Sequence, residues 1–333
     1  MLITVAICTY NRAESLRRTL DSLAAMRIPG NLAWEMLVVN NNGTDHTDRV
    51  IGEYRGRLPI RREFEPQPGL SNARNRAVDL SNGDYIVWTD DDVVVNPGWL
   101  QEYADAFRRW PDAAVFGGRI TPRYEAPVAQ WVKECEAMLA GPFAIRNLGE
   151  DTLPLSVEEN RLPFGANFAI RTVEQRKFPY NPDLGVSPNR RRMDEETDSI
   201  VRILESGAVG YWLPDAAVEH CIGRERQSIR YMRDWCEVWG ETQAFRAVAA
   251  TVPQPHFINS CQWMGLRSFR VGAAATTEPL WIGVPRGLWP RIIYRWLRYR
   301  YHRLVSPPPV WVPCLQRFSG TRGAFRYWWY RSS

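Results

Sequence analysis

The chain has 333 residues, 45% of them hydrophobic and 24% charged, which is the composition of an ordinary globular protein with a sizeable core. Its six cysteines contain no C-x-x-C pair, which argues against a zinc site, and a chain of this length needs no disulfide framework. The net charge of +5 is unevenly spread: no Asp or Glu follows Glu278, whereas ten arginines lie between Arg286 and Arg331.

The N-terminal third alternates between strand and helix patterns. Residues 2–8 form a nearly continuous apolar run, which predicts a buried strand rather than a signal peptide. Asn11 and Glu14 are spaced as a capping box and predict a helix that continues to Met26. The same reasoning predicts strands over residues 34–39, 84–89 and 113–116, and helices over residues 71–80, capped by Ser71, and 97–110. Strands separated by helices of this length predict an α/β fold with a mostly parallel sheet.

Polar clusters follow three of these strands, at residues 9–12, 40–45 and 90–92. In open α/β sheets ligands bind outside the carboxyl ends of the strands, so these clusters are expected to converge on one site. The third cluster is three adjacent aspartates, which repel one another unless a cation offsets their charge. Mg²⁺ or Mn²⁺ prefers such oxygen ligands and often shares them with substrate phosphates. The alternative is a solvated acidic turn.

Residues 119–224 are less regular and contain two notable segments. One is Phe164-Gly-Ala-Asn-Phe-Ala-Ile-Arg171, and the other is Met193-Asp-Glu-Glu-Thr-Asp198, which opens a helix that ends near Gly207. Acidic residues in a first helical turn are also what the helix dipole favours. The loop at residues 181–192 is rich in Pro, Gly and Asn, which predicts a mobile segment able to close over a bound donor.

Residues 225–250 predict a helix, and residues 285–333 form a basic, aromatic-rich tail. Within this tail apolar and cationic side chains fall on opposite faces of a predicted helix over residues 288–304. Such helices lie on anionic membrane surfaces, where each arginine contributes about 1 kcal/mol. The alternatives are a helix docked on the body of the protein and a nucleic-acid surface. A run of about 18 apolar residues, as a membrane-spanning helix requires, is absent from the sequence.

Seven segments, in the order given below, resemble the motifs of family 2 glycosyltransferases, which have the Rossmann-like GT-A fold. The resemblance covers about residues 3–250. The motifs are Ala6-Ile-Cys-Thr-Tyr-Asn-Arg12, Val38-Val-Asn-Asn-Asn-Gly-Thr-Asp45, Gly69-Leu-Ser-Asn-Ala-Arg-Asn75, the D-x-D-like Asp90-Asp-Asp92, the acceptor-side segments Phe164-Gly-Ala-Asn167 and Glu195-Glu-Thr-Asp198, and Val218-Glu-His220.

The resemblance implies a role for individual residues. It implies that Asp92 binds the metal, with His220 as a further ligand, and that Glu196 stands where the family usually has its catalytic Asp. Glu195 is the residue that exchanges roles with it in the alternative assignment. Asn40 replaces an Asp found in many members, which leaves the nucleobase open. The residues expected around the donor nucleotide are Thr9, Tyr10, Arg12, Glu14, Asn41, Arg74, Asp90 and Asp91.

The expected activity is that of an inverting, metal-dependent glycosyltransferase. It would move a sugar from a nucleoside-diphosphate sugar to a hydroxyl of a lipid-linked or polysaccharide precursor, at the cytoplasmic face of the cell membrane. Residues 1–118 would be the donor half, 119–224 the acceptor-binding and catalytic half, 225–284 a helical extension and 285–333 a peripheral membrane segment.

Two other functions, a nucleotidyltransferase and a nucleic-acid-binding protein, also fit parts of the sequence. A nucleotidyltransferase also uses metal-bound carboxylates, but it normally has a Gly-rich basic loop near the first strand, which residues 9–12 do not provide. A nucleic-acid-binding protein would use the arginine-aromatic tail. The acidic body with its three adjacent aspartates argues against that role, and nucleic acid is not an expected partner.

Overall fold

The computed structural model describes residues 1–188, 191–249, 319–320 and 322–323. The chain divides into two compact units, one built from Met1–Ala126 with Phe143–Gly223 and the other from Pro127–Pro142 with the described residues from Arg224 onward. Every residue of the predicted site lies in the first unit. The predicted basic tail at residues 285–333 lies almost entirely outside the described residues.

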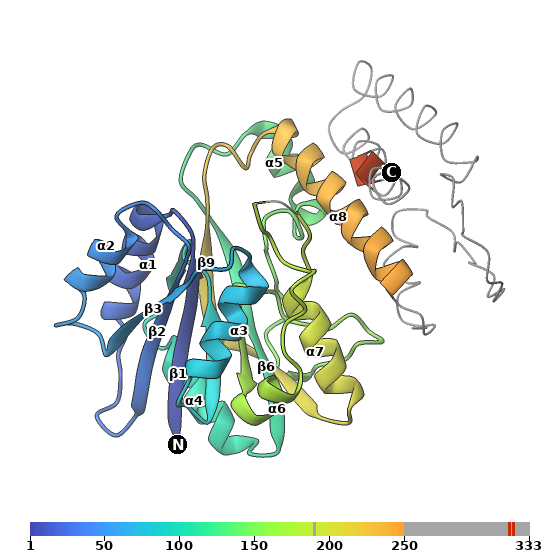
Figure 1. Ribbon diagram of the computed structural model, residues 1–333. Helices are drawn as coiled ribbons and strands as arrows, with labels where there is room; N and C mark the ends of the chain where they lie inside the picture. Colours follow the sequence, from blue (N-terminus) through green and yellow to red (C-terminus); the bar gives the residue numbers. More distant parts are fainter. Residues whose placement is uncertain (189–190, 250–318, 321, 324–333) are drawn as a thin grey trace. The chain divides into compact units, whose positions relative to one another are not determined.

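Nine strands of the first unit form one sheet, in the order β3-β2-β1-β4-β8-β6-β9-β5, with β7 pairing β9 (Figure 1). The strands are β1 (Leu2–Thr9), β2 (Ala33–Asn41), β3 (Ile60–Glu65), β4 (Tyr85–Thr89), β5 (Val93–Val95), β6 (Ala113–Tyr124), β7 (Leu153–Pro154), β8 (Asn167–Arg171) and β9 (Val209–Ile222). Strands β3, β2, β1 and β4 are parallel, and β6 is parallel to β9. The predicted α/β fold with a mostly parallel sheet flanked by helices is confirmed, and the structure adds that the sheet is mixed.

Strand β8 is the main departure from parallel order, since it runs antiparallel to both β4 and β6. Its register pairs Asn167 with Thr89. The beginning of β8 therefore lies at the same edge of the sheet as the end of β4. This reversal brings the Phe164–Asn167 segment next to the acidic cluster that follows β4.

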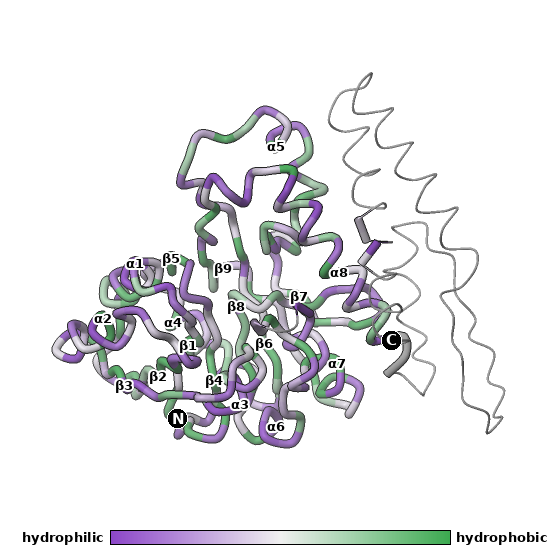
Figure 2. The backbone as a smooth tube through the Cα atoms, turned by 45° about the horizontal axis from the view of Figure 1, so that its top comes forward, coloured by the Kyte–Doolittle hydropathy of each residue, from purple (hydrophilic) through white to green (hydrophobic). Residues whose placement is uncertain are grey.

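Helices cover both faces of the sheet, and each face has its own apolar core. Alternate residues of β1 divide between the cores: Val5 and Ile7 pack with α1 and α4, whereas Ala6 packs with α3 and α7. Figure 2 shows hydrophobic residues recurring along the strands and the helices of this unit. The helices are α1 (Ala13–Ala24), α2 (Thr47–Glu53), α3 (Leu70–Leu80), α4 (Trp99–Arg109), α6 (Thr172–Lys177) and α7 (Glu195–Glu205).

The predicted capping box at Asn11 and Glu14 is wrong. Helix α1 begins at Ala13, and Asn11 adopts a positive φ of 51°. The amide of Ala13 instead donates to Asp45 Oδ2 at 3.0 Å, and Asn11 Oδ1 accepts from the amide of Thr44 at 2.7 Å. The loop after β2 therefore caps this helix, a long-range contact that a local spacing rule cannot reveal.

The predicted cap of the next helix is also wrong. Helix α3 begins at Leu70, preceded by Gly69 with φ 129°, which favours glycine. Ser71 Oγ donates to the carbonyl of Leu184 at 2.7 Å, and the amide of Leu70 donates to the carbonyl of Val186 at 3.0 Å. These bonds tie the described part of the 181–192 loop to the start of α3.

The second unit contains α5 (Gln130–Cys135), a short 3₁₀ helix (Glu136–Met138) and α8 (Ile229–Ala249). The predicted helix over residues 225–250 is α8. The amide of Ala129 donates to Gln227 Oε1 at 2.9 Å, which joins the two segments of this unit. Among the described residues, none of the helices is long and apolar enough to cross a bilayer.

Candidate active site

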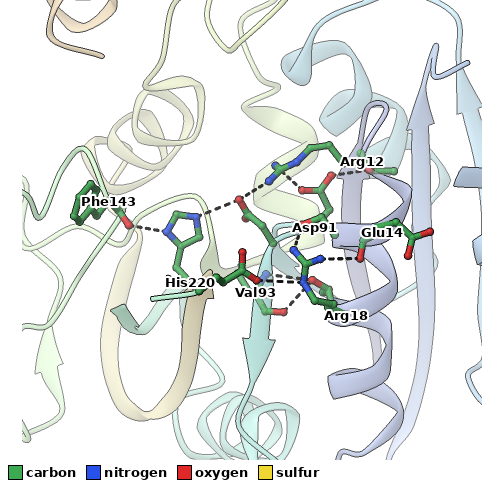
Figure 3. Close-up of polar contacts among 12 residues, drawn as sticks. Arg12, Glu14, Arg18, Asp91, Val93, Phe143 and His220 are labelled. Carbon is green, nitrogen blue, oxygen red and sulfur yellow. Dashed lines mark hydrogen bonds and ion pairs between the residues drawn. The ribbon is translucent and has the colours of Figure 1, made fainter. Parts of the chain in front are cut away.

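The three aspartates after β4 form a connected cluster rather than a row of solvated charges. Asp91 Oδ2 accepts from Thr9 Oγ1 at 2.6 Å, and its Oδ1 lies 2.7 Å from Arg12 Nη1. Arg12 Nη2 lies 2.7 Å from Asp92 Oδ2, so one guanidinium bridges both buried carboxylates (Figure 3). The alternative of a solvated turn is wrong for these two side chains, each of which is 4% exposed.

The electrostatics of the cluster follow from burial. Burial raises the pKa of Asp91 to about 7, and the neighbouring Asp92 adds to that rise, whereas Arg12 opposes it. The pKa of Asp90 is raised in the same way, mainly by burial, while Arg74 opposes the rise. Arg12 and Arg74 therefore oppose the burial and the mutual repulsion that favour protonation of this cluster.

His220 reaches this cluster through the pairing of β9 with β5. The register places Val93 opposite His220, and the amide of Cys221 donates to the carbonyl of Asp92 at 2.8 Å. His220 Nδ1 donates to the carbonyl of Phe143 at 2.6 Å, which fixes that nitrogen as protonated (Figure 3). His220 Nε2 lies 3.3 Å from Asp92 Oδ2 and points to the carboxylate.

Asp92 and His220 suit a divalent cation whose remaining coordination positions are filled by a substrate. Among the described residues, three or more His, Cys, Asp or Glu side chains do not come together as a metal cage. Mg²⁺ usually takes only one or two protein carboxylates and shares phosphates. A metal-bound histidine typically donates its other ring nitrogen to a carbonyl, as His220 does to Phe143. Asp92 and His220 would be the protein ligands of such an ion.

A second cluster is centred on Arg74, which projects from α3 and is 3% exposed. Its Nε lies 3.5 Å from Glu195 Oε1, and its Nη2 lies 3.7 Å from Asp90 Oδ1. The guanidinium also lies over three aromatic rings, with its central carbon 5.3 to 5.5 Å from the centroids of Trp88, Phe168 and Tyr180. Arg74 therefore connects the acidic cluster with the start of α7.

The two glutamates that begin α7 have different environments. Glu195 is 4% exposed, whereas Glu196 is partly exposed. Burial, and then the charge of Glu195, raise the pKa of Glu196 to about 8, and burial also raises the pKa of Glu195. A Cβ at Gly165 would lie 3.1 Å from Arg74 Nη2 and 3.4 Å from Glu196 Cδ, so glycine at this position lets both side chains approach the backbone closely. The geometry favours Glu196 as the accessible carboxylate.

Three of the residues predicted around the nucleotide are exposed or are hydrogen-bonded to other parts of the chain. Tyr10 is 47% exposed at the end of β1. Glu14 is exposed and accepts its hydrogen bonds from His46 and Arg17, away from the aspartates. Asn41 donates to the carbonyl of Gln67 at 2.8 Å and accepts from the amide of Gly69 at 2.8 Å. A base contact through the Asn41 side chain would break one of these bonds.

Asn40, the departure from the family pattern, is also engaged within the chain. Its Nδ2 donates to Asp48 Oδ1 at 2.8 Å and its Oδ1 accepts from the amide of Gly43 at 2.9 Å. Asp48 in turn forms a bidentate pair with Arg62. Asn40 therefore organises the loop after β2.

Asn167, in the predicted acceptor-side motif, is fully buried and belongs to the core. Its Oδ1 accepts from Trp99 Nε1 at 2.8 Å and from Tyr103 Oη at 2.9 Å. Its Nδ2 donates to the carbonyls of Arg119 and Ala216 at 2.9 and 2.7 Å. This asparagine joins β8 to α4, β6 and β9, a role that sequence reasoning missed because the partners are distant in the chain.

Comparisons with known proteins agree with this geometry. The family described as Glycosyl transferase family 2 matches residues 4–162. The succinoglycan biosynthesis protein ExoM of Rhizobium meliloti is 27% identical over 237 residues, which is 69% of this chain and 70% of that protein. The glucosyl-dolichyl phosphate glucuronosyltransferase of Haloferax volcanii is 26% identical over 210 residues, 62% of this chain and 64% of that protein.

Among solved structures, the mannosyltransferase PcManGT of Pyrobaculum calidifontis, in complex with GDP-Man and Mn²⁺, is similar with a TM-score of 0.59 and 16% identity. The match covers 99% of this chain and 87% of that one, and at this identity it bears on the fold alone. The strand order, the motifs at the strand ends and these matches together show that the chain contains a family 2 glycosyltransferase domain, which matches over residues 4–162, and that it has the GT-A fold.

Proposed function

We propose that the protein is a metal-dependent, inverting glycosyltransferase that uses a nucleoside-diphosphate sugar. The observation that carries the proposal is the convergence of two clusters at one edge of the sheet. Asp92 and His220 form a donor pair for a cation, and Arg74 links the neighbouring Asp90 to Glu195. Cation ligands beside a partly exposed, basic carboxylate suit the transfer of a group from a diphosphate to a hydroxyl.

On the donor side, a bound Mg²⁺ or Mn²⁺ would supply Lewis-acid stabilisation of the departing diphosphate. The residues of the chain itself would hold that group in place. Thr9 and Asp91 fix the guanidinium of Arg12, whose side chain is 42% exposed and suits phosphate oxygens. Tyr10, exposed beside it, offers a ring to the nucleobase or ribose.

On the acceptor side, Glu196 would take the proton of the attacking hydroxyl. The new bond forms between the acceptor oxygen and the anomeric carbon while the bond from that carbon to the diphosphate breaks, and a single displacement inverts the configuration. The raised pKa of Glu196, about 8, makes it a stronger base than an ordinary carboxylate. Base catalysis of this kind contributes about 10²–10⁴-fold to the rate.

For the acceptor, we infer a lipid-linked or polysaccharide precursor in cell-surface glycan synthesis. One relative is named for a dolichyl phosphate substrate and another for succinoglycan synthesis. The arginines and aromatic residues of the sequence after residue 285 suit an anionic membrane surface, which would keep the enzyme peripheral at the cytoplasmic leaflet.

A thermal-shift panel tests the proposal. UDP-, GDP- and other nucleotide sugars are added to the full chain with Mn²⁺ or with a chelator. One of them should raise the unfolding temperature, and more strongly with Mn²⁺ than without it. Stabilisation by nucleoside triphosphates but by no nucleotide sugar would favour a nucleotidyltransferase, and salt-sensitive binding of RNA would favour the nucleic-acid alternative.

A further inference from the structure

Arg74 lies where the donor and acceptor halves of the site meet, yet it is almost inaccessible. Its side chain is 4% exposed, and that of Glu195 is 5% exposed. Its Nη2 faces both Asp90 Oδ1 at 3.7 Å and the carbonyl of Gly165 at 3.4 Å. Its Nε faces Glu195 Oε1 at 3.5 Å. A ligand would have to displace these groups before it reached the guanidinium.

The surroundings of Arg74 hold it in this orientation. The rings of Trp88, Phe168 and Tyr180 lie around the guanidinium at cation-π distances. Two of these rings belong to the adjacent strands β4 and β8, and Tyr180 is 1% exposed. Such a cage, together with the carboxylates near Nε and Nη2, favours one orientation of the planar guanidinium.

We propose that Arg74 is a positioning residue that acts on the two glutamates at the start of α7 rather than on the donor. In this role it fixes Asp90 and Glu195 at set distances, and its positive charge beside the start of α7 lets Glu196 act as a base at a lower pH than the neighbouring carboxylates alone would allow. The proposal rests on the function proposed above for Glu196, and it differs from the nucleotide contact expected for Arg74 from the family resemblance.

The charges that face Glu196 support this role. They are Glu195 on its own helix, Asp194 directly before that helix, and Arg74 on α3, while the neighbouring segment before β8 presents the uncharged Gly165. The carboxylates raise the pKa of Glu196, and Arg74 is the cation that lowers it. Arg74 Nη2 and Glu196 Cδ lie 3.1 and 3.4 Å from the position of a Cβ at Gly165, so the two groups are close to one another. A nearby opposite charge lowers a carboxyl pKa by about 1–3 units. Without Arg74, Glu196 would therefore hold its proton to a higher pH.

The first experiment needs no substrate. Thermal unfolding is followed from pH 5 to 10 for the wild type, Glu196→Gln, Arg74→Met and the double variant. A raised folded-state pKa stabilises the protein below the unfolded pKa, and this contribution is lost as pH rises through the folded pKa. The difference between wild type and Glu196→Gln should therefore fall with pH and level off near pH 8.

In the Arg74→Met background the same difference should still be falling at about pH 9, because its levelling point moves up by about 1 pH unit or more. The matched control is Arg76→Met, an exposed arginine two residues further along α3, which should leave the levelling point unchanged. An unchanged levelling point in Arg74→Met would overturn the proposal, because it would mean that Arg74 and Glu196 are not coupled.

The second experiment separates positioning from donor contact. Calorimetry with the stabilising nucleotide sugar and Mn²⁺ should give a Kd for Arg74→Met within about threefold of wild type, while kcat falls about 100-fold, in the range of lost base catalysis. A Kd weaker by about tenfold or more, with an unchanged pH profile, would instead show a direct donor contact.

If Arg74→Met does not fold, Arg74→Lys decides the matter. Lysine keeps the charge but cannot fork between Asp90 and Glu195, so the pH profile should stay near wild type while kcat falls. A lysine variant with wild-type kcat would overturn the positioning role. If the wild type turns over none of the nucleotide sugars, the proposed function fails, whereas the pH dependence of unfolding still tests the coupling by itself.

Discussion

Asp92 Oδ2 lies 3.3 Å from His220 Nε2, and the antiparallel pairing of β5 with β9 creates this contact. Strand β5 begins at Val93, directly after the aspartates, so its partner strand must pass beside them. The carbonyl of Phe143 then orients the imidazole from its other side. A carboxylate and an imidazole 128 residues apart in the chain thereby lie side by side. A cation bound by both would neutralise the charge of the carboxylate.

Asp92→Ala should abolish transfer and leave the fold intact. The substitution removes the carboxylate of the proposed metal site, and Lewis-acid stabilisation is worth several kcal/mol, so a loss of about 100-fold or more in kcat is expected. Turnover is measured by release of nucleoside diphosphate, and the fold is checked by circular dichroism. Asp79→Ala, an exposed aspartate on α3, is the control. Near-normal turnover of Asp92→Ala would refute the metal role.

Arg12→Gln should make the protein more dependent on Mn²⁺ for stability. Arg12 bridges Asp91 and Asp92 at 2.7 Å each, so its loss leaves two buried carboxylates without their cation. Unfolding temperatures are compared in chelator and in Mn²⁺ without nucleotide. The rise on adding Mn²⁺ should be larger in the variant than in the wild type. Arg18→Gln, on helix α1 just after Arg12 but paired with Glu125, should behave as wild type. Equal responses in all three proteins would contradict this role of Arg12.

Glu196→Gln should keep donor binding and lose transfer by about 10²–10⁴-fold. In the wild type, the raised pKa keeps Glu196 protonated near neutral pH, so the carboxylate fraction grows as pH rises through about 8. The value of kcat/KM should rise over the same range, as measured by initial rates at fixed ionic strength. If Glu195→Gln is the inactive variant and Glu196→Gln is active, the assignment of the base is reversed.

Local patterns were sufficient for the main elements of the fold. The apolar runs of β1, β2 and β4 and the helices between them follow from periodicity, because their side chains are buried on both sheet faces. Strand β3, Ile60–Glu65, was missed since it is an edge strand in which charges replace the apolar run. The reversal of β8 was also missed, because strand direction is set by partners distant in sequence.

The site residues show the same difference between what local patterns predict and what distant contacts determine. Adjacent aspartates in the sequence suggested a cation, but the arginine that bridges Asp91 and Asp92 comes from 80 residues earlier. The family resemblance supplied Arg74 as a nucleotide contact, whereas its burial and its two carboxylate partners follow only from the packing of α3 against β4 and α7. Residue types can thus be predicted from motifs, while their partners depend on tertiary contacts.

The basic tail should bind anionic membranes. Removal of residues 285–333, or replacement of Arg291, Arg295, Arg298 and Arg303 by glutamine, should abolish co-sedimentation with phosphatidylserine vesicles, since each arginine contributes about 1 kcal/mol near such a surface. Vesicles of phosphatidylcholine alone are the control. Unchanged sedimentation of the truncated protein would count against the tail as the membrane-binding segment.

Asn167→Ala should destabilise the fold by about 3–5 kcal/mol, because it leaves several buried polar groups without a partner. These groups are the indole of Trp99, the hydroxyl of Tyr103 and the carbonyls of Arg119 and Ala216. Urea unfolding measures the loss. The control is Asn147→Ala, since this exposed asparagine makes one local bond, to the amide of Gly149, and should cost less than about 1 kcal/mol. If Asn167→Ala were as stable as the control but inactive, the residue would serve the acceptor, as its motif suggested, rather than the core.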